Sequence, residues 1–232
     1  MHPSNPRPPS NRVVKIVDLS VAIDANTQVY PGDPEVRFGT HSTIAADGFN
    51  LLSVQMGSQS GTNCDAPYHF LESGARIDEV ALELFAGPAV IIDVRGKAPR
   101  AAIELADVLP YLPALGPGMI ALFHTGWPIH NGTPSAFDHP YLSAEACVAL
   151  LDVGVRTFCL DVINIDETPD ETHPGVGFPV HQLIAAVGGV IVENLAGIEQ
   201  IDFAPFVTAF PLRLTGADGS PTRAVAFHLE TE

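Results

Sequence analysis

Basic residues are scarce in this sequence. Its 232 residues include 11 lysines and arginines against 27 aspartates and glutamates, so the formal net charge is −16 at pH 7. A chain with this charge repels phosphate backbones and anionic lipid headgroups. We therefore expect neither a nucleic acid nor a membrane among its partners.

Long hydrophobic runs are also missing. No uninterrupted apolar stretch approaches the ~18 residues that a membrane-spanning helix needs. The N-terminus lacks the basic-then-apolar order of a secretory signal peptide. These two absences predict a cytoplasmic protein.

Cysteine is low in number and irregular in spacing. The chain has three cysteines, Cys64, Cys147 and Cys159, and no Cys-x-x-Cys pair. This pattern indicates neither a disulfide framework nor a thiolate zinc cluster. Cys147 and Cys159 are expected to be small buried residues, whereas Cys64 needs separate attention because Asp65 follows it.

The composition that remains suits one globular domain. Hydrophobic residues make up 46% of the chain and charged residues 16%, and the length is sufficient for a sizeable core. Residues 1–12 contain four prolines among polar residues, which predicts a disordered, Pro-rich arm. Residues 13–232 show no repeat and no change of composition, so they are expected to form the single domain.

Short apolar or β-branched runs, bounded by glycine, proline or polar residues, predict mostly interior strands. The expected strands are residues 13–19, 51–56, 89–94, 119–123, 155–161 and 190–193. Two short helices are expected between them, one capped by Ser143 and reaching Leu151, the other over residues 178–187. A C-terminal hairpin over residues 206–214 and 223–229 would make the sheet mixed, so the predicted fold class is α/β.

The densest group of reactive side chains is residues 59–69, Gln-Ser-Gly-Thr-Asn-Cys-Asp-Ala-Pro-Tyr-His, directly after an expected strand. Asp65 and His69 are four residues apart around Pro67, which stiffens the segment. A rigid loop at a strand end can direct a carboxylate and an imidazole toward one point. The same two residues could equally form a structural hydrogen-bonded pair, and the residues alone leave both interpretations open.

A second group is His181, on the later expected helix, and Glu193, at the end of the strand that follows it. A helix and its following strand commonly pack face to face, so these side chains can approach each other. An acid at the end of an apolar strand is costly to bury without a cation or a hydrogen-bond donor. Alternatively, Glu193 reaches solvent and His181 is an ordinary hydrogen-bonded histidine.

Several short motifs, in order along the chain, together resemble a known family. The motifs are Asp18-Leu19-Ser20, Tyr30-Pro31-Gly32-Asp33-Pro34, Gly61-Thr62 with Asp65, Pro67 and His69, His124-Thr125-Gly126-Trp127, His181, and Glu193-Asn194-Leu195. This series resembles the cyclase family, which includes bacterial kynurenine formamidase and isatin hydrolase, over residues 16–230. The resemblance implies a swivelling β/β/α fold and a homodimer or homotetramer.

The metal-binding signature of that family is His-x-Gly-Thr-His-x-Asp-x-Pro-x-His, and this chain departs from it twice. Gln59 and Asn63 stand where the two leading histidines are expected. An amide offers only a weak carbonyl oxygen in place of an imidazole, which should lower the affinity for metal at those positions. The resemblance implies that Asp65, His181 and Glu193 still bind one divalent ion, zinc or manganese; a site without metal is the alternative.

The resemblance also assigns roles around this ion. His69 is the expected proton donor and acceptor, and Tyr30 is expected to pack on the substrate. Apart from the resemblance, Trp127 is expected to supply a second flat, apolar wall. In an extended segment neighbouring side chains alternate, so Cys64 is expected to point away from the side that Asp65 faces.

The predicted function is the metal-dependent hydrolysis of a small amide, either an aryl formamide or a cyclic amide. An ion that polarises the carbonyl and acidifies a water would act together with His69 as general acid and base. Two alternatives share the fold. One is a metal-independent cyclase, dehydratase or isomerase that uses His69 and Asp65, and the other is an inactive protein that binds a small molecule.

Overall fold

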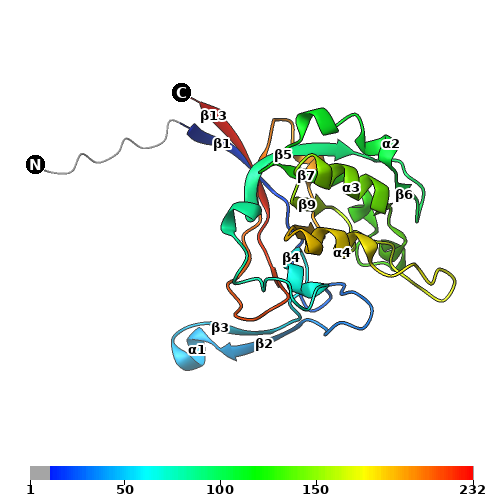
Figure 1. The fold of residues 1–232 in the computed structure, drawn as a ribbon. Coiled ribbons are helices and arrows are strands. Elements are labelled where there is room, and N and C mark those ends of the chain that lie inside the picture. The colour runs from blue at the N-terminus through cyan, green and yellow to red at the C-terminus, as the bar shows by residue number, and fades with distance from the viewer. Residues whose placement is uncertain (1–10, 232) are drawn as a thin grey trace, which may run out of the picture.

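A nine-stranded mixed sheet forms the centre of the computed structural model, which describes residues 11–231 (Figure 1). In spatial order its strands are β1 (Asn11–Asp18), β13 (Val225–Thr231), β11 (Phe206–Thr208), β5 (Ala86–Asp93), β7 (Ile120–His124), β9 (Thr157–Leu160), β10 (Val190–Glu193), β4 (Asn63–Asp65) and β12 (Gly219–Pro221). The predicted α/β class with a mixed sheet is confirmed.

Four neighbouring strands, β5, β7, β9 and β10, run parallel. Every residue of β7, β9 and β10 is buried, as expected for parallel strands that are covered on both faces. Four of the strands expected from apolar runs correspond to this central group, and they are interior strands as predicted.

Helices cover one face of the parallel strands (Figure 1). They are α2 (Leu105–Val108), α3 (Ala144–Asp152) and α4 (Pro179–Ala186). The Ser143 hydroxyl accepts a hydrogen bond from the Ala146 amide, so the predicted cap of α3 is confirmed. Leu150 of α3 and Ile184 of α4 are fully buried in the core between helices and sheet. Short 3₁₀ turns lie at Pro67–His69, Leu82–Phe85, Leu112–Ala114, Trp127–His130, Pro134–Asp138 and Ile198–Gln200.

A second core lies against the opposite face of the sheet and includes residues of its antiparallel strands β1, β11 and β13. Leu122, Cys159 and Val192 point into this core from the parallel strands. The expected C-terminal antiparallel pair is present, because β11 pairs with β13. Between these two strands, however, the chain crosses to the other edge of the sheet and forms β12 beside β4.

Two segments differ from the structure predicted for them. The strand β3 (Leu51–Gln55) was expected inside the sheet, but it pairs with β2 (Arg37–Ser42) in a separate hairpin that carries α1 (Ile44–Asp47). This hairpin projects from the main body (Figure 1), and β3 is exposed along its whole length. The second segment, β4, was expected to be a loop and is instead a buried strand.

The N-terminal boundary is also corrected. Residues 11 and 12 were expected in a disordered arm, but they belong to β1 and pair with Thr231 and Glu230 of β13. The rest of the expected arm, residues 1–10, lies outside the described residues. Within residues 11–231 no helix is both long and apolar enough to cross a membrane. The cytoplasmic location stays a prediction.

A further two-stranded sheet joins β6 (Ala102–Ile103) to β8 (Tyr141–Leu142) in parallel.

Candidate active site

The pairing of β4 with β10 brings the carboxyl groups of Asp65 and Glu193 to the same side of the sheet. The strands are antiparallel, with Asn63 opposite Glu193 and Asp65 opposite Ile191. Residues that face each other across a ladder project to the same side, and alternate residues share that side. Asn63, Asp65 and Glu193 therefore project toward the face that α4 covers.

Cys64 lies between them in β4 and projects the other way, as predicted. It is fully buried in the core of the opposite face, and its thiol lies 3.5 Å from the carbonyl oxygen of Ser220. Burial raises the pKa of the Cys64 thiol well above its usual value, with Asp65 adding to the shift. A protonated thiol that faces away from the site is a packing residue.

Asp166 positions His181 at the start of α4. Its carboxylate accepts hydrogen bonds from the backbone amides of Val180 and His181, each at 3.0 Å. The same carboxylate lies 2.7 Å from Nδ1 of the His181 ring. Because Nδ1 is bonded to Asp166, the other ring nitrogen, Nε2, points toward β4 and β10.

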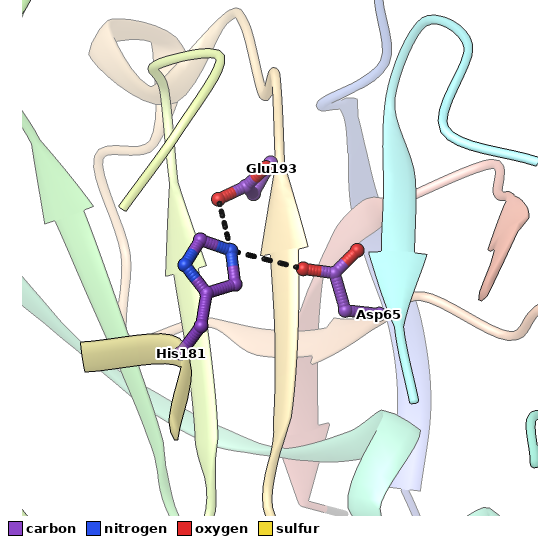
Figure 2. Close-up of side chains that lie close together, drawn as sticks. All are labelled: Asp65, His181 and Glu193. Carbon is purple, nitrogen blue, oxygen red and sulfur yellow. Dashed lines mark ion pairs between the residues drawn. The ribbon is translucent and has the colours of Figure 1, made fainter. Parts of the chain in front are cut away.

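The three residues meet around His181 Nε2 (Figure 2). This nitrogen lies 3.4 Å from Asp65 Oδ2 and 3.6 Å from Glu193 Oε1. One ligand atom from each residue lies within 4.8 Å of the other two, and all three side chains are buried. The structure therefore brings together the predicted group of Asp65, His181 and Glu193, although they come from three separate elements.

The charges in this group are unbalanced. Burial lowers the pKa of His181, but the bond to Asp166 and the nearby carboxylates of Asp65 and Glu193 outweigh it and raise the pKa to about 10. Burial, with a contribution from Asp65, raises the pKa of Glu193 to about 8. The three carboxyl groups of Asp65, Asp166 and Glu193 thus lie beside the single imidazole of His181. A divalent cation would stabilise the ionised forms of these carboxyl groups.

Unpartnered oxygens also fit a cation. Among residues 11–231, three buried side-chain oxygens have no hydrogen-bond partner: Gln59 Oε1, Asn63 Oδ1 and Asp65 Oδ2. Each such buried group costs on the order of 1–3 kcal/mol when it stays unsatisfied. All three residues line one cavity, so a single ion there could relieve more than one of these penalties. Asp65, His181 and Glu193 could hold it.

His69 lines the same cavity and is oriented by Asp218. Its Nδ1 lies 2.9 Å from Asp218 Oδ2, which leaves Nε2 as the other titratable atom of the ring. Burial lowers the pKa of His69, but the bond to Asp218 and the charge of Asp65 raise it overall. A held imidazole with a raised pKa is suited to proton transfer.

The cavity has a volume of about 200 Å³ and a wall of aromatic rings. Tyr30 lines it, as predicted, and its hydroxyl lies 3.4 Å from Asn164 Nδ2. Phe70 packs on the His181 ring with centroids 4.1 Å apart, and Phe178 lies 5.1 Å from Phe70.

Trp127 is not among the residues that line this cavity, which corrects the expectation that it forms a wall. The indole is buried in the core beside the helices, and its Nε1 donates to the Ser135 carbonyl at 3.0 Å. It follows Gly126, whose positive φ of 74° turns the chain away from the end of β7.

Sequence reasoning missed two acids that hold the site. Asp166 is not among the candidate site residues of the sequence, yet it is 2% exposed and bonded to His181. Asp218 was placed within a hairpin loop, yet it contacts His69. The N-cap residue of the helix that carries His181 is Phe178, and Asp166 lies well before it in the sequence, so no local capping signal marks Asp166. No local signal marks Asp218 either.

Comparisons with known proteins identify the family of this chain. The sequence model of the Cyclase family, described as "Putative cyclase", matches residues 17–167. The chain belongs to the cyclase family. Among related members, kynurenine formamidase of Delftia acidovorans is 31% identical over 91% of this chain and 96% of its own length. Kynurenine formamidase of Geobacillus thermodenitrificans is 27% identical over 90% of this chain and 95% of its own.

Solved structures show that the cyclase-family fold is shared. An isatin hydrolase bound to the product analogue thioisatinate superposes with a TM-score of 0.82 at 22% identity, over 95% of this chain and 94% of the hydrolase. A structure described as a potential metal-dependent hydrolase with cyclase activity superposes with a TM-score of 0.74 at 24% identity, over 92% of this chain and 97% of that one. The family resemblance and the fold class predicted from the sequence are both confirmed.

Proposed function

We propose that this protein hydrolyses an amide bond of a small molecule, using one divalent metal ion held by Asp65, His181 and Glu193. The observation that carries the proposal is the convergence of these three buried side chains around His181 Nε2. Membership of a family whose relatives are named kynurenine formamidase supports the reaction class.

A zinc or manganese ion bound here would supply Lewis acidity to polarise an amide carbonyl and acidify water. The chain's own residues would hold that ion, and they move the protons. His181 presents Nε2 because Asp166 holds Nδ1, while Asp65 and Glu193 provide the negative charge.

His69 transfers the proton to the leaving nitrogen. In hydrolysis, the oxygen of water bonds to the carbonyl carbon, the C–N bond breaks, and the departing nitrogen needs a proton. His69 stands in the cavity with Nδ1 bonded to Asp218, so Nε2 is the atom that exchanges this proton. Its raised pKa keeps a larger fraction of the ring protonated near neutral pH.

The substrate is a small aromatic amide, an aryl formamide or a cyclic aryl amide. Tyr30, Phe70 and Phe178 offer flat surfaces around a cavity of about 200 Å³. The printed names of its relatives and structural neighbours, kynurenine formamidase and isatin hydrolase, support these two substrate classes.

The test combines metal analysis with turnover. Protein stripped with a chelator is supplied with Zn²⁺ or Mn²⁺, and hydrolysis of an aryl formamide and of isatin is measured. We expect about one ion per chain, as one group of three ligands implies, and turnover that depends on it. His181→Ala should lose the ion, whereas the matched control His228→Ala, on β13 against Phe203, should keep it.

Two outcomes would contradict the proposal. Full turnover by the stripped protein would favour the metal-independent cyclase, dehydratase or isomerase. Ligand binding without turnover of either substrate, at full metal content, would favour an inactive binder.

We also propose that the protein forms a homodimer or homotetramer through the β2–β3 hairpin. Phe38 lies opposite Val54 and Thr40 opposite Leu52, so one face of the hairpin is mainly apolar. Phe38, Leu52 and Val54 are 38%, 53% and 48% exposed. A projecting two-stranded hairpin is marginally stable alone, and a second copy of the chain would cover this face.

A further inference from the structure

The orientation of the Gln59 amide is decided by its neighbours. Nε2 donates a hydrogen bond of 2.9 Å to Asp218 Oδ2. A carboxylate accepts only, so the nitrogen of the amide must be the end that faces Asp218. A Cβ at Gly219 would collide with this nitrogen, so the glycine permits the approach. Oε1 is consequently the free end, and it is buried without a partner beside the cavity.

The Asn63 amide is oriented in the same way. Its Nδ2 donates to the carbonyl oxygens of Gly61 at 3.1 Å and Gln59 at 3.3 Å, and carbonyls cannot donate in return. Oδ1 is therefore the free end, and it too is buried without a partner. Asn63 stands directly opposite Glu193 in the β4–β10 ladder and lines the same cavity.

We infer that Gln59 and Asn63 are further ligands of the divalent ion, and that their neutral amide oxygens make the site favour manganese more than a histidine-rich site would. This inference rests on the metal role proposed above. Each amide is anchored at its nitrogen and offers a fixed oxygen, so little conformational entropy is lost when that oxygen binds.

The donor set explains the direction of the preference. Two carboxylates, two amide oxygens and one imidazole form an oxygen-rich group, which suits manganese, whereas imidazole-rich groups suit zinc. Zinc generally binds a given site more tightly than manganese does. The inference therefore concerns the ratio of the two affinities and how single substitutions change it.

The experiment measures the dissociation constants of Mn²⁺ and Zn²⁺ for stripped protein by calorimetry or chelator competition. Gln59→Ala and Asn63→Ala should each weaken Mn²⁺ binding by about tenfold and Zn²⁺ binding by less. Asn63→His should shift the ratio of affinities toward Zn²⁺ by about tenfold. Thermal unfolding of each variant checks that it is folded; Gln59 lies outside the sheet, so its variant carries the test if Asn63→Ala fails to fold.

Gln28→Ala is the matched control. This glutamine also uses its amide in two hydrogen bonds, donating to the Thr133 carbonyl and accepting from the Gly132 amide, but it lies outside the cavity. Its loss should leave both dissociation constants unchanged.

Two results would overturn the inference, and they are distinguishable. If unmutated protein binds Mn²⁺ and the Gln59 and Asn63 variants bind it equally well, the amide oxygens are not ligands, and the proposed function stands. If unmutated protein binds neither ion, the metal role itself fails before any variant is made.

Discussion

At the residue scale, acidic side chains orient the imidazole and amide groups that line the cavity. Asp166 holds His181, and Asp218 holds both His69 and Gln59. Asp218 also accepts a hydrogen bond of 2.8 Å from the Ser58 hydroxyl. Its bonds with His69, and then with Gln59 and Ser58, lower the pKa of Asp218, so it remains ionised across the physiological range. Each of these supports can be removed separately.

His69→Ala should abolish most of the turnover and leave metal binding intact. A positioned acid or base contributes about 10²–10⁴-fold to a reaction rate. His69 is not one of the residues proposed to bind the ion, so the ion should stay. Steady-state kinetics and metal analysis on the same sample check both parts, and an unchanged kcat would exclude His69 as the proton donor.

Asp218→Asn should move the pH profile. Burial lowers the pKa of His69 and Asp218 raises it, so a neutral amide at position 218 lets that pKa fall. Because His69 must be protonated to supply the leaving nitrogen, kcat/KM should begin to decline at a lower pH than in the unmutated protein. Ser58→Ala is the matched control: it removes one bond to Asp218 but keeps the charge, so its basic limb should stay in place.

At the element scale, the start of α4 links helix stability to the site. The Asp166 carboxylate caps the amides of Val180 and His181 and also holds the imidazole. Ser143 is the N-cap residue of α3, where it accepts one bond from the Ala146 amide, and it does not line the cavity. The two caps therefore offer a way to separate the helix from the site.

Asp166→Ala should reduce both stability and metal affinity. Loss of an N-cap costs about 0.5–2 kcal/mol of unfolding free energy. Loss of the group that orients a ligating histidine lowers metal affinity by about 10–100-fold. Ser143→Ala should show a similar loss of stability with unchanged metal affinity. Denaturant unfolding and metal titration of both variants check this, and equal metal affinities would show that Asp166 only caps the helix.

At the scale of the whole molecule, the hairpin and the sheet differ in how well they are covered. The parallel strands β7, β9 and β10 are buried on both faces, while β3 is exposed throughout. The apolar face of the hairpin includes Phe38, Leu52 and Val54, and its other face carries Arg37, Ser53 and Gln55. Subunit contacts through the apolar face would complete the coverage.

Leu52→Lys should therefore lower the molecular mass in solution. A charge placed in an apolar contact is costly to bury, so the proposed homo-oligomer should dissociate toward the monomer. Ser53→Lys, on the opposite face of the same strand, should leave the mass unchanged. Light scattering after size-exclusion chromatography measures both, and a monomeric unmutated protein would rule out the proposed contact.

Much of the local structure could be predicted from the sequence because its causes are local. Apolar runs identified the central parallel strands, and Ser143 identified the start of α3. Alternation along the chain placed Cys64 and Asp65 on opposite sides. The ordered motifs also identified the family, as its sequence model confirms.

Only the tertiary structure decided which neighbours complete the site. Asp218 directly precedes β12, and it reaches His69 because β12 pairs with β4, a strand that is distant from it in the sequence. Asp166 reaches His181 because the loop that carries it packs on α4. Phe70 and Phe178, and not Trp127, line the cavity for the same reason. The apolar run at residues 51–56 predicted a strand, but it could not show that this strand, β3, lies outside the main sheet. Hydrogen-bond geometry and propensity act over a few residues, whereas strand register and side-chain convergence depend on how the whole chain packs.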